Sequence, residues 1–286
     1  MRPVRTSIHP AAWIPRWTNQ TAPHALERAA ALGFDHVVVT LRRFEDIDPP
    51  AIVRAFENVG LTPVNAAGQS PDADVSSPDA QTRARGLERL RTALRLARDM
   101  GSRYVGGVLY SALRKFERGP AEGAWEASAN AIATIGEEAR DYGIRLALEI
   151  VNRYESNLIN TVDQALRFLE VVSCDNVYLH LDTFHLNIEE SSLVDALSKA
   201  LPRLAYFELD QNHRGALDGG LIDFQPLLAA LARRRFDGIV GIEAFSRPTL
   251  AEDHADALAV WRATFADGNA VAREGMRLID AAFPIR

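Results

Sequence analysis

Short apolar runs alternate with longer amphipathic stretches along the whole chain. The runs are rich in Val, Ile and Leu and are bounded by polar or glycine residues, which is typical of buried β-strands. Because they are apolar almost throughout, they favour a sheet that is covered on both faces. We expect eight strands, over residues 4–8, 35–41, 61–67, 104–109, 144–150, 177–182, 204–210 and 238–244.

The stretches between these runs have the apolar spacing of amphipathic helices. Several carry end signals: Gly33 follows the first, Thr161 is placed to cap another, and Ser77 and Pro78 suggest an N-cap followed by a proline at the first helical position. Helices are predicted over residues 25–32, 50–59, 76–100, 122–142, 161–172, 191–201, 224–235 and 250–265, with an additional helix and tail from 268 onward.

Eight strands, each followed by a helix, predict an α/β fold built as one (β/α)₈ TIM barrel over residues 1–286. The length of 286 residues suits such a barrel, which typically needs about 250 residues. A doubly wound open sheet is the structural rival. That fold usually has a glycine-rich fingerprint after its first strand, and no such fingerprint is present here.

Composition narrows the possible functions. The formal charge of −6 argues against a nucleic-acid partner, because phosphate binding relies on clustered Lys and Arg. No run of about 18 apolar residues predicts a membrane span, and the N-terminus lacks the apolar core of a secretion signal, so a cytoplasmic location is expected. The single cysteine, Cys174, excludes a disulfide within the chain and a cysteine-based zinc site.

Each of the last four predicted strands ends in an acid. These acids are Glu149, Asp182, Glu208 together with Asp210, and Glu243. The chemistry of TIM barrels lies at the C-terminal ends of the strands, so neighbouring strands should bring these carboxylates to one point. Carboxylates beside buried aliphatic residues are costly unless they are paired or bound to a cation, and oxygen ligands suit Mg²⁺ or Mn²⁺. The set predicts a divalent metal site, although any one acid alone could cap a helix or pair with an arginine.

The loops after these acids are unusually polar, which suits a ligand with many hydroxyl groups. His185 is expected to contact the substrate or to support a metal ligand, and Arg214 to bind a hydroxyl or a phosphate. Trp13, Trp17 and Phe245 are equally consistent with an apolar wall for a sugar face and with ordinary packing. The loops concerned are residues 152–155, 183–187 and 212–215.

These segments resemble the xylose isomerase-like TIM barrels and, among them, the D-tagatose 3-epimerase and D-psicose (D-allulose) 3-epimerase group. The resemblance runs through most of the chain. Residues 72–90 and 106–111 also match the group, but less specifically than the segments given next. The most specific segments are LEIVNRYESNLINT (148–161), LDTFHLNIEE (181–190), NHRGALDGGLIDF (212–224) and GIEAF (241–245).

The resemblance implies a metal-dependent sugar epimerase. Members of this group bind Mn²⁺, Co²⁺ or Mg²⁺, and Mn²⁺ is expected here. Glu149, Asp182 and Glu243 stand where three of the family's four ligands belong. The two glutamates would also be catalytic: one removes the proton beside the ketose carbonyl and the other returns a proton on the opposite face of an enediolate. The residues matching substrate-binding positions are Glu155, His185 and Arg214.

One position departs from the family pattern. Counting back six residues from Arg214, the family's histidine ligand falls on Glu208. The family's Gly-Glu pair two residues further on becomes Asp210 and Gln211. Glu208 is therefore expected to bind the metal in place of the imidazole, with Asp210 as the alternative. The departure leaves open a ketose phosphate, a tetrulose or an oxidised sugar as the substrate.

Other functions remain to be separated from a ketose 3-epimerase. An aldose–ketose isomerase, acting on a sugar or a sugar phosphate, would use the same enediolate. A non-catalytic sugar-binding relative would result if Glu208 abolishes metal binding. A DNA-repair endonuclease on this barrel would need a histidine-rich zinc site, whereas only His185 and His213 of the seven histidines lie in the site loops. The resemblance also implies a homo-oligomer, either a dimer or a tetramer.

Overall fold

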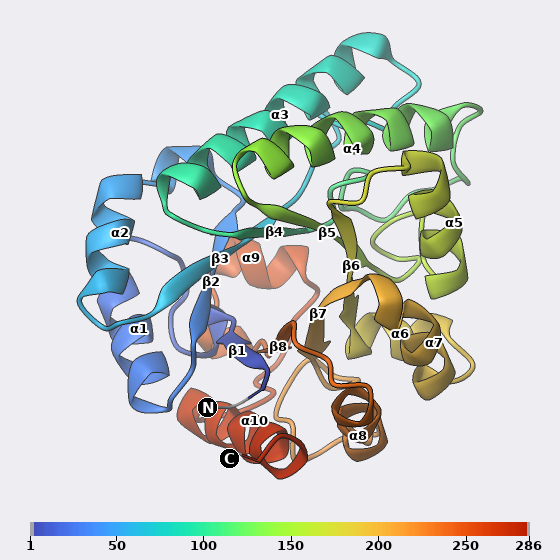
Figure 1. The fold of residues 1–286 in the computed structure, drawn as a ribbon. Coiled ribbons are helices and arrows are strands. Elements are labelled where there is room, and N and C mark those ends of the chain that lie inside the picture. The colour runs from blue at the N-terminus through green and yellow to red at the C-terminus, as the bar shows by residue number, and fades with distance from the viewer. Residues whose placement is uncertain (1–2, 285–286) are drawn as a thin grey trace.

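A closed barrel of parallel strands forms the centre of the molecule. The computed structural model describes residues 3–284, so both ends of the domain predicted over 1–286 lie outside the described residues. Eight strands pair in chain order within this range, and the last closes on the first (Figure 1). They are β1 (Arg5–Ile8), β2 (His36–Leu41), β3 (Thr62–Ala67), β4 (Tyr104–Gly107), β5 (Arg145–Ile150), β6 (Val177–Asp182), β7 (Leu204–Leu209) and β8 (Ile239–Ile242).

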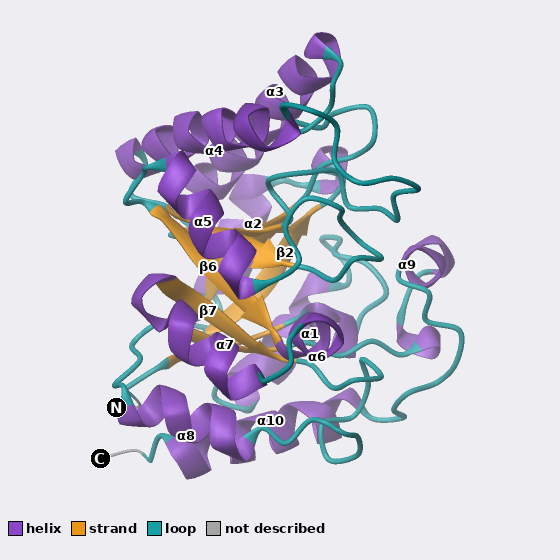
Figure 2. Cartoon of the chain, turned by 90° about the vertical axis from the view of Figure 1, so that its right-hand side faces the viewer, coloured by secondary structure: helices purple, strands orange, loops and turns teal. Residues whose placement is uncertain are grey.

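Helices surround the barrel, and loops gather on one side of it (Figure 2). The predicted (β/α)₈ fold is therefore confirmed. The α-helices are α1 (Ala22–Ala31), α2 (Pro49–Glu57), α3 (Ala80–Asp99), α4 (Ala124–Asp141), α5 (Val162–Val172), α6 (Thr183–Glu189), α7 (Leu193–Ala200), α8 (Gln225–Arg233), α9 (Glu252–Ala257) and α10 (Gly268–Ala282). Short 3₁₀ helices cover Pro10–Ala12, Phe44–Asp46, Leu201–Arg203 and Arg247–Thr249.

Two helix starts show how capping decides the boundaries. α5 begins after Thr161, the N-cap that the sequence suggested, and Thr161 forms a capping box with Gln164. The start predicted for the long third helix is wrong. Its N-cap is Asp79, whose carboxylate accepts a hydrogen bond from the Thr82 N–H at 2.7 Å, and not Ser77. The carboxylate at 79 satisfies the first turn, so the helix begins two residues after Pro78.

The segment after β8 also differs from the prediction of a helix over 250–265. Only α9 is helical there, and Ala259, with φ of 54°, has the left-handed backbone that ends it. Figure 2 shows α9 standing apart from the helices that surround the barrel. Contacts with α8 and β8 give α10 the place of the eighth barrel helix. The prediction of a loop over 183–187 is also wrong, because these residues lie in α6.

Two tyrosines pack inside the barrel with the smaller apolar side chains of Val38, Val64, Ala147 and Ala205. The rings of Tyr104 and Tyr206 lie 5.3 Å apart, and both side chains are buried. Gly106 and Gly241 make this possible, because a Cβ at either position would lie within 2.4 Å of a tyrosine hydroxyl. No helix of residues 3–284 is long and apolar enough to cross a membrane.

Strand register determines the levels of the acids inside the barrel. Glu149 is paired with His180, and Asp182 is paired with Glu208. Glu208 is in turn paired with Gly241 on β8. Because side chains alternate along a strand, Asp210 and Glu243 point to the same side as Glu208 but one level closer to the C-terminal end. The backbone N–H of Glu243 confirms this alignment by donating to the Leu209 carbonyl at 3.1 Å.

Candidate active site

A cavity of about 590 Å³ opens at the C-terminal ends of the strands. Several strands contribute to its polar lining, as the barrel architecture predicts. His9, directly after β1, lines the cavity together with residues from the second half of the chain. Those residues are Glu149, Glu155, His185, Arg214 and Glu243.

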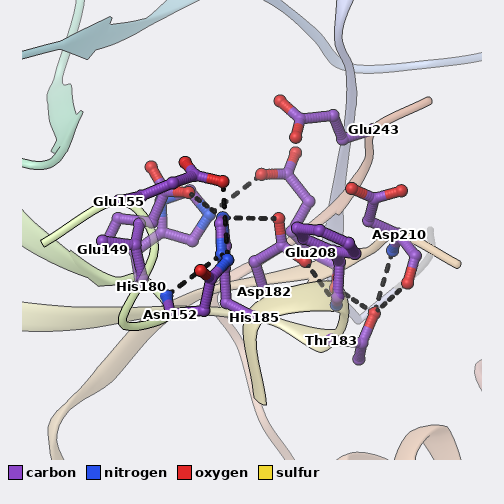
Figure 3. Close-up of polar contacts among 12 residues, drawn as sticks. Glu149, Asn152, Glu155, His180, Asp182, Thr183, His185, Glu208, Asp210 and Glu243 are labelled. Carbon is purple, nitrogen blue, oxygen red and sulfur yellow. Dashed lines mark hydrogen bonds and ion pairs between the residues drawn. The ribbon is translucent and has the colours of Figure 1, made fainter. Parts of the chain in front are cut away.

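Two groups of side chains could hold a metal ion. In each, one ligand atom per residue lies within 4.8 Å of the others. The first group is Glu149, Asp182 and His185, and the second is Asp182, Asp210 and Glu243. Asp182 belongs to both, and Figure 3 shows it between Glu149 and Asp210. The acids predicted at the strand ends therefore gather in two groups joined by Asp182, with Glu149 in one group and Asp210 and Glu243 in the other.

Hydrogen bonding defines the tautomer of His185. Its Nδ1 accepts from the Asn152 backbone N–H at 3.2 Å and lies 2.8 Å from the Asn152 amide nitrogen. Burial lowers the pKa of His185 well below its usual value, and Arg214 acts in the same direction, so the ring is neutral. The proton is therefore on Nε2, which lies 3.6 Å from Glu149 Oε1 and 3.8 Å from Asp182 Oδ2. In this state His185 is a hydrogen-bond donor toward the site rather than a metal ligand.

Asp182 and Asp210 each have one anchored oxygen and one without a partner. Asp182 Oδ1 accepts from the Phe184 N–H at 2.7 Å and thereby caps α6. Asp210 Oδ2 accepts from Arg214 Nε at 3.0 Å. Among the described residues, Asp182 Oδ2 and Asp210 Oδ1 are buried without any hydrogen-bond partner. A buried carboxylate oxygen without a partner is costly, and a bound cation would remove that cost.

The acids of the site share a low-dielectric environment. Burial raises the pKa of Glu149 to about 8. Burial is also the largest cause that raises the pKa values of Asp182, Asp210 and Glu208 well above the ordinary range. The acids of the site outnumber Arg214, the guanidinium that pairs with Asp210 and Glu243, so the set fits a divalent cation.

Glu208, predicted as a metal ligand, is in neither of the two groups. Its Oε2 lies 3.0 Å from His180 Nε2, and its Oε1 accepts from the Tyr206 hydroxyl at 3.2 Å. Tyr206 is also hydrogen bonded to Ser7 on β1. Glu208 thus takes part in a buried network inside the barrel, below the cavity.

Arg214 supplies positive charge to the site beside Asp210 and Glu243. Its guanidinium lies between the rings of Phe184 and Phe245, 4.5 and 4.7 Å from their centroids. It pairs with Glu243 and Asp210, and its Nη1 lies 3.6 Å from Glu155 Oε1. The backbone at Arg214 has φ of 55°, a left-handed conformation that turns the loop after β7 and is uncommon for a residue with a side chain.

The aromatic residues named from the sequence have separate positions. Trp17 and Phe245 line the cavity, and Trp17 also stacks on Phe56. Trp13 is not in that lining, and its indole N–H donates to the Asn269 side chain at 2.9 Å. His9 was missed by the sequence reasoning, although its place directly after the first strand could have indicated it. Its Nε2 lies 3.8 Å from Glu243 Oε1.

Known proteins with similar sequences are sugar epimerases. An L-ribulose 3-epimerase of Mesorhizobium japonicum is 34% identical over 276 residues, which cover 96% of this chain and 93% of that protein. A ketose 3-epimerase of Arthrobacter globiformis is also 34% identical, over 92% of this chain and 91% of its own length. These relatives confirm the prediction of an enzyme of the isomerase class.

Solved structures agree with this assignment. A D-allulose 3-epimerase of Methylomonas sp., in complex with D-allulose, superposes with a TM-score of 0.94 at 31% identity and covers 99% of this chain and 98% of its own. The family model described as "Xylose isomerase-like TIM barrel" matches residues 26–280. The chain therefore belongs to the xylose isomerase-like TIM barrel family, as the resemblance in its sequence implied.

Proposed function

We propose that this protein is a metal-dependent ketose 3-epimerase. The observation that carries the proposal is the placement of Glu149 and Glu243, which enter one cavity from β5 and from the end of β8. In Figure 3 Glu149 lies to the left of Asp182, and Glu243 lies above Asp182 at the upper right of the cluster. The relatives named L-ribulose 3-epimerase and ketose 3-epimerase support the same reaction type.

Two carboxylates that reach one cavity from different strands suit epimerisation beside a carbonyl. One glutamate takes the proton from C3 of the ketose, and the electron pair of the C–H bond forms a C=C bond while the carbonyl oxygen gains negative charge. The other glutamate then delivers a proton to the opposite face of C3, and the carbonyl forms again. Both Glu149 and Glu243 border the cavity, so either is within reach of the substrate without a change in the barrel.

Glu149, Asp182 and Glu243 are proposed to hold the divalent cation. When bound, such a cation would supply positive charge that offsets the negative charge developing on the substrate oxygens. The largely carboxylate donor set favours Mn²⁺, with Mg²⁺ and Co²⁺ as alternatives.

Three further residues are proposed to position the sugar. The Nε2–H of His185 and the guanidinium of Arg214 are donors for substrate oxygens, and the Glu155 carboxylate is an acceptor for a hydroxyl. Arg214 is held by its two aromatic neighbours, so its orientation is set before a substrate arrives. By the same resemblance we expect a homo-oligomer, which size-exclusion chromatography with light scattering would test.

The test is proton exchange in D₂O. Protein loaded with Mn²⁺ is incubated with L-ribulose, D-allulose, D-fructose, a tetrulose and ketose phosphates, and the products are followed by NMR. The proposal expects deuterium at C3 together with the C3 epimer. Aldose products would instead identify an aldose–ketose isomerase, and no exchange with any sugar would contradict both.

A further inference from the structure

β7 and its end carry two acids that could complete the metal site, and their environments differ. Glu208 is level with Gly241, whereas Asp210 is two residues further on and level with Glu243. Both are almost completely buried, with exposed fractions of 3% and 0%. Burial alone therefore does not distinguish them, and their hydrogen bonds must.

The carboxylate of Glu208 has no oxygen left over. Tyr206 donates to one oxygen, and Nε2 of His180 lies at hydrogen-bond distance from the other. The ring of His180 also packs against that of Tyr206, with centroids 4.3 Å apart. To reach a cation, Glu208 would have to give up its contacts with Tyr206 and His180 inside the barrel, and breaking buried hydrogen bonds of this kind is costly.

Asp210 has the opposite arrangement. Arg214 Nε holds its Oδ2, and its Oδ1 is buried without a partner among the described residues. A ligand oxygen of Asp210 lies within 4.8 Å of those of Asp182 and Glu243. Asp182 has the same pattern of one anchored and one free oxygen. Asp182 and Asp210 are thus two fixed carboxylates of the same group, each with an oxygen that has no partner in the described part of the chain, and this arrangement suits a bound cation.

The hydroxyl of Thr183, the residue after Asp182, binds the backbone of Asp210 and so keeps the two aspartates close together. It accepts a hydrogen bond from the Asp210 N–H at 2.9 Å and donates to the Asp210 carbonyl at 2.7 Å. Thr183 directly follows Asp182 at the end of β6. The backbone of Asp210 is therefore attached to the strand that carries Asp182, and Figure 3 shows this attachment.

We propose that Asp210, and not Glu208, is the fourth protein ligand of the cation, together with Glu149, Asp182 and Glu243. Glu208 is then a positioning residue that orders His180 and Tyr206 beneath the site. The inference rests on the cation site of the proposed function, but not on the identity of the sugar. It implies a protein donor set made only of carboxylates, which suits a hard divalent ion such as Mn²⁺ or Mg²⁺.

The experiment measures Mn²⁺ binding without any sugar. The full-length protein is stripped of metal and titrated with Mn²⁺, and free Mn²⁺ is followed by EPR. D210N removes the proposed ligand charge, and E208Q is the matched control, since it removes one negative charge from a neighbouring position on the same strand. We expect D210N to bind Mn²⁺ at least about tenfold more weakly than E208Q. Equal losses, a larger loss in E208Q, or no binding by the unmodified protein would overturn the inference.

A second readout does not depend on the folding of D210N. The visible absorption spectrum of bound Co²⁺ reports the ligands directly, and E208Q is expected to give the spectrum of the unmodified protein. A changed spectrum in E208Q would identify Glu208 as a ligand and overturn the inference. Deuterium exchange into sugars is measured separately, so a protein that binds Mn²⁺ through Asp210 but exchanges no sugar proton would refute only the epimerase proposal.

Discussion

The two halves of the cavity wall are built differently. The half from β5 to β8 carries acids placed by strand register, and two of their oxygens are buried without partners among residues 3–284. The half from β1 to β3 carries arginines on loops and on α3, most of which are already engaged. The arginines that line it are Arg16, Arg42, Arg43 and Arg89.

Most of these arginines have partners that explain them. Arg16 pairs with Asp253, and Arg43 pairs with Glu45 and Asp46. Arg89, on α3, joins two loops by donating to the carbonyls of Gly68 and Arg42, each at 2.8 Å. Within the described part of the chain, the Arg42 side chain has no hydrogen bond or ion pair.

The comparison separates chemistry from recognition. The acidic half has unmatched charge in a rigid setting, which suits cation binding and proton transfer. Most arginines of the half from β1 to β3, the arginine half, are already paired within the protein. Arg42 is the unpaired one among those that line the cavity within the described residues, and it suits a weaker contact with the far end of a substrate.

The largest effect is expected from removing either proton-transfer group. Glu149→Gln and Glu243→Gln keep the shape of the side chain but cannot carry a proton between states, so kcat should fall about 10²–10⁴-fold. Steady-state kinetics with the best ketose of the panel measures the effect. Glu57→Gln, on exposed α2, is the control and should leave kcat unchanged. Near-normal activity in both site variants would remove the catalytic distinction between the two halves.

An intermediate effect is expected from the cation itself. Mn²⁺ at 100 times its Kd should raise the free energy of unfolding by about 2.7 kcal/mol, because only the folded chain presents the gathered carboxylates. Thermal unfolding of metal-stripped protein, with and without Mn²⁺, measures this difference. Asp182→Asn should abolish most of the stabilisation. If Mn²⁺, Mg²⁺ and Co²⁺ all leave the melting temperature unchanged, the acidic half is not a cation site.

The smallest effect is expected from the arginine half. Arg42 is exposed, and a contact of this kind contributes about 0.2–1 kcal/mol. Arg42→Ala should therefore raise KM for a ketose phosphate by up to about fivefold and leave KM for the neutral ketose unchanged. The ratio of the two KM values is the measurement, and Arg95→Ala on the outer face of α3 is the control. A large fall in kcat for neutral sugars would show that the arginine half also takes part in the chemistry.

The same contrast explains what could be predicted from the sequence. The ends of the strands could be predicted from the sequence, because buried apolar runs have a clear pattern. An acid at the end of each of the last four runs is easy to recognise. Glu149, Asp182 and Glu243 were predicted as site residues in this way, and each of them belongs to one of the two groups that could hold a metal. The competition between Glu208 and Asp210 could not be decided, since both lie on the same side of the chain near the end of β7. Only the partners Tyr206, His180 and Arg214 separate them.

The geometry of the loops was the part of the structure that the sequence predicted least well. α6 was expected to be a loop because its start depends on Asp182, which was read only as a ligand although it also caps that helix. The helix predicted over 250–265 failed because the left-handed Ala259 ends α9 early, and α10 packs on the barrel instead. His9 and Arg42 reach the cavity from loops, and no periodic pattern indicates where a loop side chain will lie.

The most direct test of the proposed chemistry is NMR of the C3 position in D₂O, comparing the Mn²⁺-loaded protein with its Glu149→Gln and Glu243→Gln variants on one ketose. The unmodified protein should incorporate deuterium at C3 as the epimer forms, and each variant should lose epimer formation. Epimer formation without deuterium at C3, or at an unchanged rate in either variant, would contradict proton transfer by these two carboxylates.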